Sequence, residues 1–290
     1  MARTPERDLK VVRRAYAKQI MAAAGVPCER LAHAFAAVPR ENFLGPGPWP
    51  ILRWGRGYQP SPGDDPVYLY TDDLIGIDPA REINNGQPSF HFALMARLDP
   101  QPDEHVVHIG TGTGYYSAIL AELVGARGRV TAIEHDPGLA ALATANLAAR
   151  RQVEVIEGDG TVADFDAADG IYVNAGVTHP PARWLDRMLH GGRIVLPMTA
   201  LRSRIANRPG PRWTGVVFLI RRRGQRFAAQ RISAVAIYPC EGARARTAER
   251  ALARALKGGG AERVRHLHRH NRIPPERCWL QGEGWCLAYA

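Results

Sequence analysis

His108-Ile-Gly-Thr-Gly-Thr-Gly-Tyr-Tyr116 is the stretch that decides the fold of this 290-residue chain. It follows the apolar pair Val106-Val107 and opens a helical pattern over residues 115–124. The next apolar run, residues 130–133, ends at the acidic residue Glu134. A strand, a glycine turn, a helix, a second strand and an acid, in this order, are typical of a site for a nucleotide-type cofactor.

The glycine turn has the spacing GxGxG at Gly110, Gly112 and Gly114, not the GxGxxG of pyrophosphate binders. Glycine lets the backbone approach a ligand closely because it lacks Cβ and tolerates positive φ. Taken alone, the motif is also compatible with a tight structural turn. Glu134 lies twenty residues beyond Gly114, where a carboxylate can accept hydrogen bonds from both ribose hydroxyls. The turn and this acid together favour a ligand site.

A third strand ends in Glu157-Gly-Asp159-Gly160. An acid at this place can accept a hydrogen bond from the amino group of adenine, although the same residues alone would also suit a turn. Loops that follow consecutive parallel strands meet at one end of the sheet, where open α/β sheets bind ligands. The three loops together therefore predict an adenosine site.

Strands and helices alternate through the middle of the chain, which predicts right-handed crossovers and a parallel sheet. Two later runs, residues 216–221 and 232–237, predict an antiparallel pair at one sheet edge. We expect strands at 105–109, 129–133, 153–156, 170–174 and 193–197, and helices at 8–24, 29–38, 90–98, 115–124, 137–149, 181–189 and 247–256.

Three regions follow from this pattern. Residues 1–80 hold N-terminal helices and an ordered Trp- and Pro-rich cap loop at 45–68, whose aromatic and aliphatic side chains need burial. Residues 81–240 hold the ligand-binding domain, and residues 241–290 form a basic extension that ends in a short strand or cap over 278–290.

The composition, 46% hydrophobic and 23% charged, is ordinary for a globular protein. No run approaches the roughly 18 apolar residues of a membrane span, and no secretion signal follows the first arginines. The four cysteines show no CxxC spacing and indicate no disulfide framework. We therefore expect a cytoplasmic protein without a membrane partner.

Residues 201–290 hold 19 Lys and Arg residues against 5 Asp and Glu residues. Such a stretch can attract nucleic acid or an acidic peptide, or it can be a solvated Arg-rich surface. No aromatic-interleaved RNA motif accompanies the charge, which favours the solvated surface. The triplet His266-Leu-His268-Arg-His270 lacks further metal-ligand partners, so we predict no metal site.

The chain resembles the protein-L-isoaspartate O-methyltransferase family. The resemblance extends from about residue 10 to about residue 240. The family's "VPRE.F" element is present at 38–43, its "GTGSGY" loop at 110–115, its "GDG" at 158–160 and its "GGR(L/I)V.P" at 191–197. The resemblance implies a Rossmann-like S-adenosylmethionine-dependent methyltransferase fold: a mostly parallel α/β sheet with an antiparallel edge, N-terminal helices and a C-terminal extension.

The resemblance also implies the cofactor, S-adenosyl-L-methionine, and the residues that contact it. His108 replaces the acid that often precedes the Ile-Gly of the loop, and it is either a cofactor contact or a buried structural histidine. The expected cofactor-binding residues are His108, Gly110, Thr111, Gly112, Gly114, Tyr115, Glu134, His135, Asp159, Gly160 and Asn174.

The acceptor loop departs from the family. Its Thr-Ile-Ser positions are Asn84-Asn85-Gly86 here, followed by Gln87-Pro88-Ser89. We expect Asn85, Gln87 and Ser89 to hold the acceptor by hydrogen bonds, with a polar turn that caps the next helix as the structural alternative. His91 and His179 could act as bases for a hydroxyl or amine acceptor, although each is more often structural.

The resemblance implies an O-methyltransferase that methylates a carboxylate of a peptide or protein, as in the repair of isoaspartyl residues. Two alternatives stay open. One is methylation of a dedicated modified peptide or of a small molecule, and the other is a non-catalytic S-adenosylmethionine-binding or RNA-associated protein.

Overall fold

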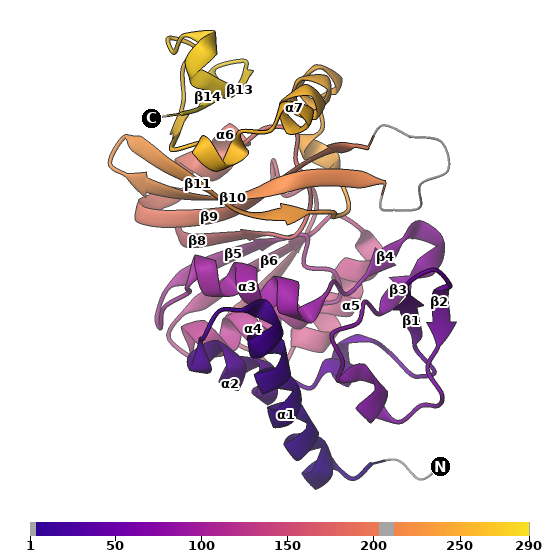
Figure 1. Cartoon of the computed structure of the whole chain (residues 1–290). Helices are drawn as coiled ribbons and strands as arrows, with labels where there is room; N and C mark the ends of the chain where they lie inside the picture. Colours follow the sequence, from indigo (N-terminus) through magenta and orange to yellow (C-terminus); the bar gives the residue numbers. More distant parts are fainter. Residues whose placement is uncertain (1–3, 203–211, 290) are drawn as a thin grey trace. The chain divides into compact units, whose positions relative to one another are not determined.

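The computed structural model describes residues 4–202 and 212–289. The chain forms two compact units (Figure 1). Unit 1 comprises Met1–Asp103, Thr111–Ala132 and Asp136–Val155, and unit 2 comprises Glu104–Gly110, Ile133–His135 and Ile156–Ala290. The predicted division at residues 80 and 240 stays a prediction.

Unit 1 contains the N-terminal helices, the glycine-loop helix and two small hairpins. Its helices are α1 (Glu6–Ala24), α2 (Glu29–Ala37), α3 (Pro88–Leu98), α4 (Tyr115–Val124) and α5 (Pro137–Leu147), with short 3-10 turns at Arg40–Phe43, Pro66–Leu69 and Pro79–Arg81. Its hairpins are β1 (Pro50–Arg53) with β2 (Gly57–Pro60), and β3 (Gly76–Asp78) with β4 (Ile83–Asn84). All five helices agree with the sequence expectation to within two residues at each end.

Aromatic side chains form the centre of unit 1. The ring of Phe35 lies 5.3 Å from Phe92 and 6.3 Å from Tyr115. The cap loop has a separate small core of Trp49, Ile51, Leu69 and Ile75. The expectation that the tryptophans of this loop are buried is therefore correct for Trp49 and wrong for Trp54, which is 84% exposed at the tip of the β1–β2 hairpin.

Arg40, from the "VPRE.F" element, ties the segment that precedes β3 to the helical part of unit 1. Its side chain is fully buried and donates to the backbone carbonyls of Leu69 (2.7 Å), Thr71 (3.1 Å) and Asp73 (3.1 Å). A guanidinium has five N–H donors in a fixed fork, so one side chain can satisfy several carbonyls at once. Arg40 thus fixes the backbone on either side of Asp72.

Unit 2 contains most of the main sheet. Its strands are β5 (His105–Ile109), β8 (Ala168–Val173), β9 (Met188–Leu201), β10 (Trp213–Arg223), β11 (Arg226–Val235), β12 (His266–His268), β13 (Cys278–Gly282) and β14 (Trp285–Ala288). Its helices are α6 (Ala182–Asp186) and α7 (Arg246–Gly258), with 3-10 turns at Glu241–Ala243, Ala261–Arg263 and Pro275–Arg277. Strands β6 (Arg129–Glu134) and β7 (Val153–Glu157) begin in unit 1 and end in unit 2.

The strand order in unit 2 is β13-β14-β12-β11-β10-β9-β8-β5. Pairs β5–β8 and β8–β9 are parallel, and every pair from β9 to β13 is antiparallel. The α/β fold with an antiparallel section is confirmed, but that section is wider than expected. The β10–β11 pair was predicted at the sheet edge, which is wrong because residues of the C-terminal extension add β12, β14 and β13 beyond it.

Two boundaries in unit 2 also differ from the expectation. Strand β9 begins at Met188, so the preceding helix ends at Asp186, not at 189. Strand β11 begins at Arg226 because the turn after β10 is only two residues long. The arginine of the "GGR" element, Arg193, forms two 2.7 Å contacts with the carboxylate of Glu104 and donates to the carbonyl of Asp169 at 3.0 Å. Arg193, in the central part of β9, therefore connects this strand to the beginning of β5 and to the beginning of β8.

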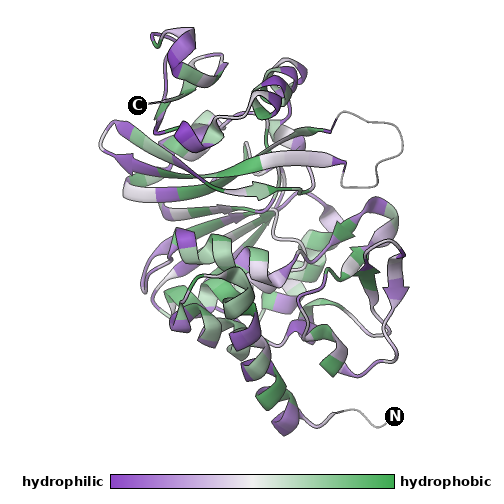
Figure 2. Cartoon of the chain, in the orientation of Figure 1, coloured by the Kyte–Doolittle hydropathy of each residue, from purple (hydrophilic) through white to green (hydrophobic). Residues whose placement is uncertain are grey.

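Hydrophobic residues occupy the middle of the long strands, as the colouring of β10 in Figure 2 shows. Residues 215–220 of β10 are all buried, whereas its last residues are polar and more exposed. Among the described residues, no helix is both long and apolar enough to cross a membrane.

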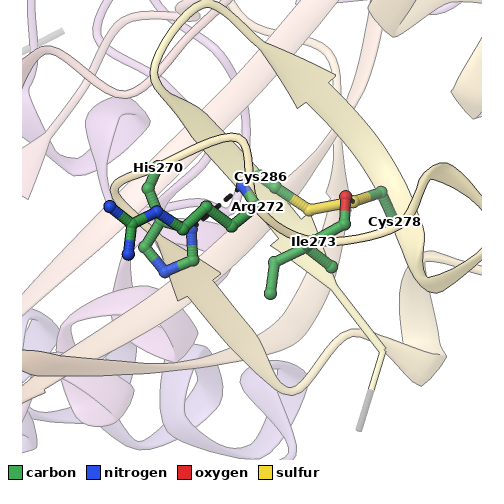
Figure 3. The surroundings of a disulfide bond; sticks show 5 residues. All are labelled: His270, Arg272, Ile273, Cys278 and Cys286. Atoms are coloured by element: carbon green, nitrogen blue, oxygen red, sulfur yellow. Dashed lines mark hydrogen bonds between the residues drawn. A yellow bond between two sulfur atoms is a disulfide. The ribbon is translucent and has the colours of Figure 1, made fainter.

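The C-terminal extension ends in a hairpin with a disulfide (Figure 3). Cys278 and Cys286 are bonded to each other, with their Cα atoms 6.2 Å apart, and Ile273 lies beside them. The sequence spacing of these cysteines did not predict the bond. The disulfide depends on the antiparallel pairing of β13 with β14. Gly282 pairs with Trp285 beside the turn of this hairpin, so the two strands lie side by side.

Candidate functional site

The C-terminal ends of four strands are joined by backbone hydrogen bonds within unit 2. Gly110 donates to the carbonyl of Ile133, Gly158 to that of Glu134, and Asn174 to that of Ile109, each at 2.8 Å. These bonds connect the residues that end β5, β6, β7 and β8. Gly110, Glu134, Asp159 and Asn174 therefore lie at one end of the sheet, as the alternation of strands and helices predicted.

The glycine loop has the backbone conformation for which glycine is suited. Gly110, Gly112 and Gly114 have φ values of 77°, 59° and 96°. A Cβ added to Gly110 would lie 3.3 Å from the carbonyl oxygen of Asn174, and one added to Gly112 would meet no atom within 4 Å. The loop thus exposes bare backbone at Gly112, which is the arrangement a closely approaching ligand requires.

The acidic candidates in unit 2 differ in their surroundings. Glu134 is 8% exposed, and His135, which follows it, is exposed. Oδ1 of Asp159 accepts hydrogen bonds from the backbone N and the hydroxyl of Thr161, both at 2.8 Å. One oxygen of this carboxylate is therefore held in place, and the side chain has a defined orientation.

Gly160 packs tightly against the end of β5. Its carbonyl accepts a hydrogen bond from the indole of Trp184 at 2.7 Å, and a Cβ at this position would lie 2.7 Å from Cγ2 of Ile109. The "GDG" element therefore needs its last glycine for packing, in addition to any role in ligand binding.

Thr111 and Tyr115 belong to unit 1 and are buried there. The hydroxyl of Thr111 is hydrogen-bonded to that of Ser117. The ring of Tyr115 lies 5.6 Å from Phe43 and 5.0 Å from Tyr116. Burial raises the pKa of the Tyr115 hydroxyl well above its usual value, so this side chain stays neutral within the aromatic core of the unit.

His108 is fully buried in β5, beside Tyr172 of β8 at a ring distance of 5.2 Å. Burial lowers the pKa of His108 to about 3, so the imidazole is neutral at physiological pH. A neutral histidine therefore stands where the sequence resemblance implied an acid.

The acceptor loop of unit 1 is organised around Asp72, a residue that the sequence analysis did not identify. Its carboxylate accepts from the backbone N of Ser89 (2.8 Å), the hydroxyl of Ser89 (2.6 Å) and Nε2 of Gln87 (3.0 Å). Two of the three predicted acceptor residues are therefore held by one acid at the N-terminus of α3. No local pattern in the sequence marks Asp72, since its partners lie 15 and 17 residues away.

Asn85, the third predicted acceptor residue, has a different environment. Its backbone N donates to the carbonyl of Ile75 at 2.8 Å, and the residue is 6% exposed. Its side-chain Nδ2 is buried and has no hydrogen-bond partner among residues 4–202 and 212–289. Buried polar groups are nearly always paired, so this donor is available to a ligand or to a water molecule.

The two histidines considered as bases have structural contacts. His91 is 2% exposed and stacks on Tyr116 with a ring distance of 3.8 Å. His179 is half-buried, and its Nδ1 lies 3.2 Å from the hydroxyl of Thr178. Burial, and secondly the charge of Arg244, lowers the pKa of His179. Within the part of the chain that the structure describes, no three His, Cys, Asp or Glu residues are grouped to hold a metal ion.

A family model described as Protein-L-isoaspartate(D-aspartate) O-methyltransferase (PCMT) matches residues 61–208, just over half of the chain. The chain belongs to this family. A relative from Methanoregula boonei, named Protein-L-isoaspartate O-methyltransferase, is 33% identical over 226 residues, which cover 77% of this chain and 89% of the relative. The resemblance that the sequence motifs indicated is thus confirmed.

Solved structures agree on the fold. One protein-L-isoaspartate O-methyltransferase superposes with a TM-score of 0.62 at 24% identity, over 84% of this chain and 69% of its own. A β-aspartate methyltransferase (PCMT) from Plasmodium falciparum, in complex with S-adenosyl-L-homocysteine, has a TM-score of 0.59 at 14% identity, over 79% of this chain and 97% of its own. As a member of the protein-L-isoaspartate O-methyltransferase family, the chain is an S-adenosylmethionine-dependent methyltransferase with a Rossmann-like fold.

Proposed function

We propose that this enzyme methylates a carboxylate of a peptide or protein, with an isoaspartyl side chain as the acceptor. The observation that carries the proposal is the match of this chain to the protein-L-isoaspartate O-methyltransferase family. Within unit 1, the buried amide donor of Asn85, which has no partner among the described residues, supports a polar acceptor. An isoaspartyl methyl ester would cyclise toward a succinimide, so the biological role we propose is protein repair in the cytoplasm.

The cofactor half of the proposal rests on residues of known position. The bare backbone of the Gly110–Gly114 loop would approach the amino-acid part and ribose of the cofactor, Glu134 would accept from the ribose hydroxyls, and Asp159 would accept from the adenine amino group. The remaining cofactor contacts that we propose are His108, Thr111, Tyr115, His135, Gly160 and Asn174. The side chains of His108, Thr111 and Tyr115 are buried, so we propose that any contact they make with the cofactor is accompanied by a role in supporting the loop.

The acceptor half needs little acid–base chemistry. A carboxylate is already ionised at neutral pH, so no proton has to be removed before it attacks. Bound S-adenosylmethionine supplies an electrophilic methyl group on a sulfonium. The protein then has to orient the acceptor and exclude water. Asn85 would donate to the acceptor carboxylate, while Gln87 and Ser89, held by Asp72, would define the wall beside it.

Labelled methyl transfer to an isoaspartyl peptide, beside its aspartyl twin, tests the acceptor. We expect transfer to the isoaspartyl peptide and much less to the twin. Calorimetry with S-adenosylhomocysteine tests the cofactor site: the wild type should bind, and Glu134→Ala and Asp159→Ala should each bind about tenfold or more weakly, because a hydrogen bond to a charged group contributes about 1.5–3 kcal/mol. A wild-type protein that binds no cofactor would contradict the proposal.

A second acceptor class is favoured by the loop itself, because Asn84-Asn85-Gly86 offers no hydroxyl group where the sequence resemblance implied Thr and Ser. Transfer to neither peptide would indicate a dedicated modified peptide or a small molecule. The RNA-associated alternative and the basic extension at 241–290 as a separate region stay predictions. The RNA role requires salt-dependent RNA retention that is lost on truncation after about residue 240.

A further inference from the structure

The segment 238–243, which leads into the C-terminal extension, is attached to the loop after β8. Within unit 2, Gly176 donates to the carbonyl of Tyr238 at 2.7 Å, and Cys240 donates back to the carbonyl of Gly176 at 2.9 Å. Thr178 donates to the carbonyl of Ala243 at 3.0 Å. These bonds place residues 238–243 directly beside Asn174-Ala-Gly176, one of the loops at the proposed cofactor site.

Arg244 secures the end of this segment. Its guanidinium donates to the carbonyls of Thr199 (2.8 Å) and Gly176 (3.2 Å) and pairs with Glu249 of α7 at 2.7 Å. The segment is thus held by β9, by the loop after β8 and by the helix that follows it. Its position is set by several independent contacts.

Gly242, in the middle of this segment, lies against the carboxylate of Asp159. A Cβ built on Gly242 would come closer than 3.0 Å to both carboxylate oxygens and to Cγ of Asp159. Its φ is not in the left-handed region, so the constraint is space and not backbone conformation. Nearby Cys240 gives a second indication, since burial and the charge of Asp159 raise the pKa of its thiol to about 11.

We propose that the turn Glu241–Ala243 forms one wall of the adenosine site and that Gly242 is a positioning residue for Asp159. The inference rests on the proposed role of Asp159 as the acceptor for the adenine amino group. Thr161 donates two hydrogen bonds to Oδ1 of Asp159. Because Gly242 has no side chain, Oδ2 of Asp159 can occupy the position that it has in the structure. A methyl group at 242 would force the carboxylate to rotate away, because the colliding atoms are the end of the Asp159 side chain.

The test compares two ligands that differ at the adenine amino group. S-Inosylhomocysteine carries a carbonyl in place of that amino group, so position 6 of its base cannot donate to Asp159, and the carbonyl oxygen there is repelled by the carboxylate. Calorimetry should show that the wild type prefers S-adenosylhomocysteine over S-inosylhomocysteine at least tenfold. Gly242→Ala should weaken S-adenosylhomocysteine binding about tenfold, or about 1.4 kcal/mol, and leave S-inosylhomocysteine binding unchanged or tighter. A merely structural defect would weaken both ligands equally.

Gly258→Ala is the matched control, because a Cβ at Gly258 meets no atom within 4 Å and its φ is not in the left-handed region. It should keep the wild-type preference. The double variant Asp159→Ala/Gly242→Ala should bind like Asp159→Ala alone, since Gly242 acts through the carboxylate. If Gly242→Ala does not fold, the double variant should fold, because the colliding carboxylate is gone.

Wild-type ligand preference in Gly242→Ala would overturn the inference. So would a double variant that is unfolded, or one that binds S-adenosylhomocysteine tenfold more weakly than Asp159→Ala. A wild type that binds neither ligand would instead contradict the proposed cofactor site. The two failures are therefore distinguishable.

Discussion

Replacing Asn85 by leucine should change stability and activity in opposite directions. Leucine has nearly the shape of asparagine but lacks the buried Nδ2, which has no partner among the described residues. Leaving a buried polar group unpaired costs about 1–3 kcal/mol. Asn85→Leu should therefore raise the free energy of unfolding of the free enzyme by about 1 kcal/mol or more, and its melting temperature by about 2–4 °C for each kcal/mol.

The same substitution should impair methyl transfer. A hydrogen bond from an amide to an ionised acceptor contributes about 1.5–3 kcal/mol, so kcat/KM for an isoaspartyl peptide should fall about 10- to 150-fold. Binding of S-adenosylhomocysteine should not change. Such a stability gain with a loss of function is the pattern expected of a residue kept for ligand binding.

Thermal unfolding and initial rates of labelled methyl transfer measure the two effects. Asn271→Leu is the control, because Asn271 is exposed, and it should leave activity unchanged. If Asn85→Leu destabilises the free enzyme by about 2 kcal/mol, or transfers methyl groups at the wild-type rate, Asn85 does not hold the acceptor.

Three further predictions concern stability. Arg40→Met should lower the free energy of unfolding in urea by about 2 kcal/mol or more, because one buried and two partly buried carbonyls lose their donor; a loss below about 1 kcal/mol would contradict this role. His108 has a folded pKa of about 3, below its ordinary 6.5, so its stabilising contribution is complete above pH 6.5 and is lost as the pH falls toward 3, at about 1.4 kcal/mol per pH unit. His108→Phe should flatten the stability profile between pH 4 and 6 relative to the wild type, and equal slopes would refute the assignment. Reducing the Cys278–Cys286 bond, which closes a short loop, should lower local stability by about 2–3 kcal/mol, seen as faster hydrogen exchange in β13 and β14 and not in β5.

The cofactor end of the sheet could be predicted from the sequence because its signals are local. Strand β5 and helix α4 have the predicted bounds, since a short apolar run, a glycine turn and a long apolar helix are each visible within a few residues. The alternation of strands and helices predicted a parallel sheet, whose strands end at one side in ligand-binding loops. Neither Glu134 nor Asp159 required any long-range contact to be identified.

The acceptor loop and the C-terminal extension could not be predicted in the same way. Asp72 binds Gln87 and Ser89 across 15 and 17 residues, and Gly242 meets Asp159 across more than 80 residues. The bond between Cys278 and Cys286 likewise depends on a hairpin whose strands have only four or five residues each. Contacts of this kind depend on the tertiary fold, and propensity or periodicity carries no signal of them.

The course of the loop at residues 84–89, the predicted acceptor loop, is fixed by contacts within unit 1. A Cβ on Gly86 would collide with the ring of His91, which is itself fixed by stacking on Tyr116. Gly86 also donates through its backbone N to Oδ1 of Asn84 at 2.9 Å. These contacts, together with Asp72, set the course of the loop without any side chain at 86. Asn85 is the side chain in this loop whose buried donor is unpaired among the described residues. It follows that acceptor specificity in this enzyme should depend on residue 85 far more than on the path of the backbone around it.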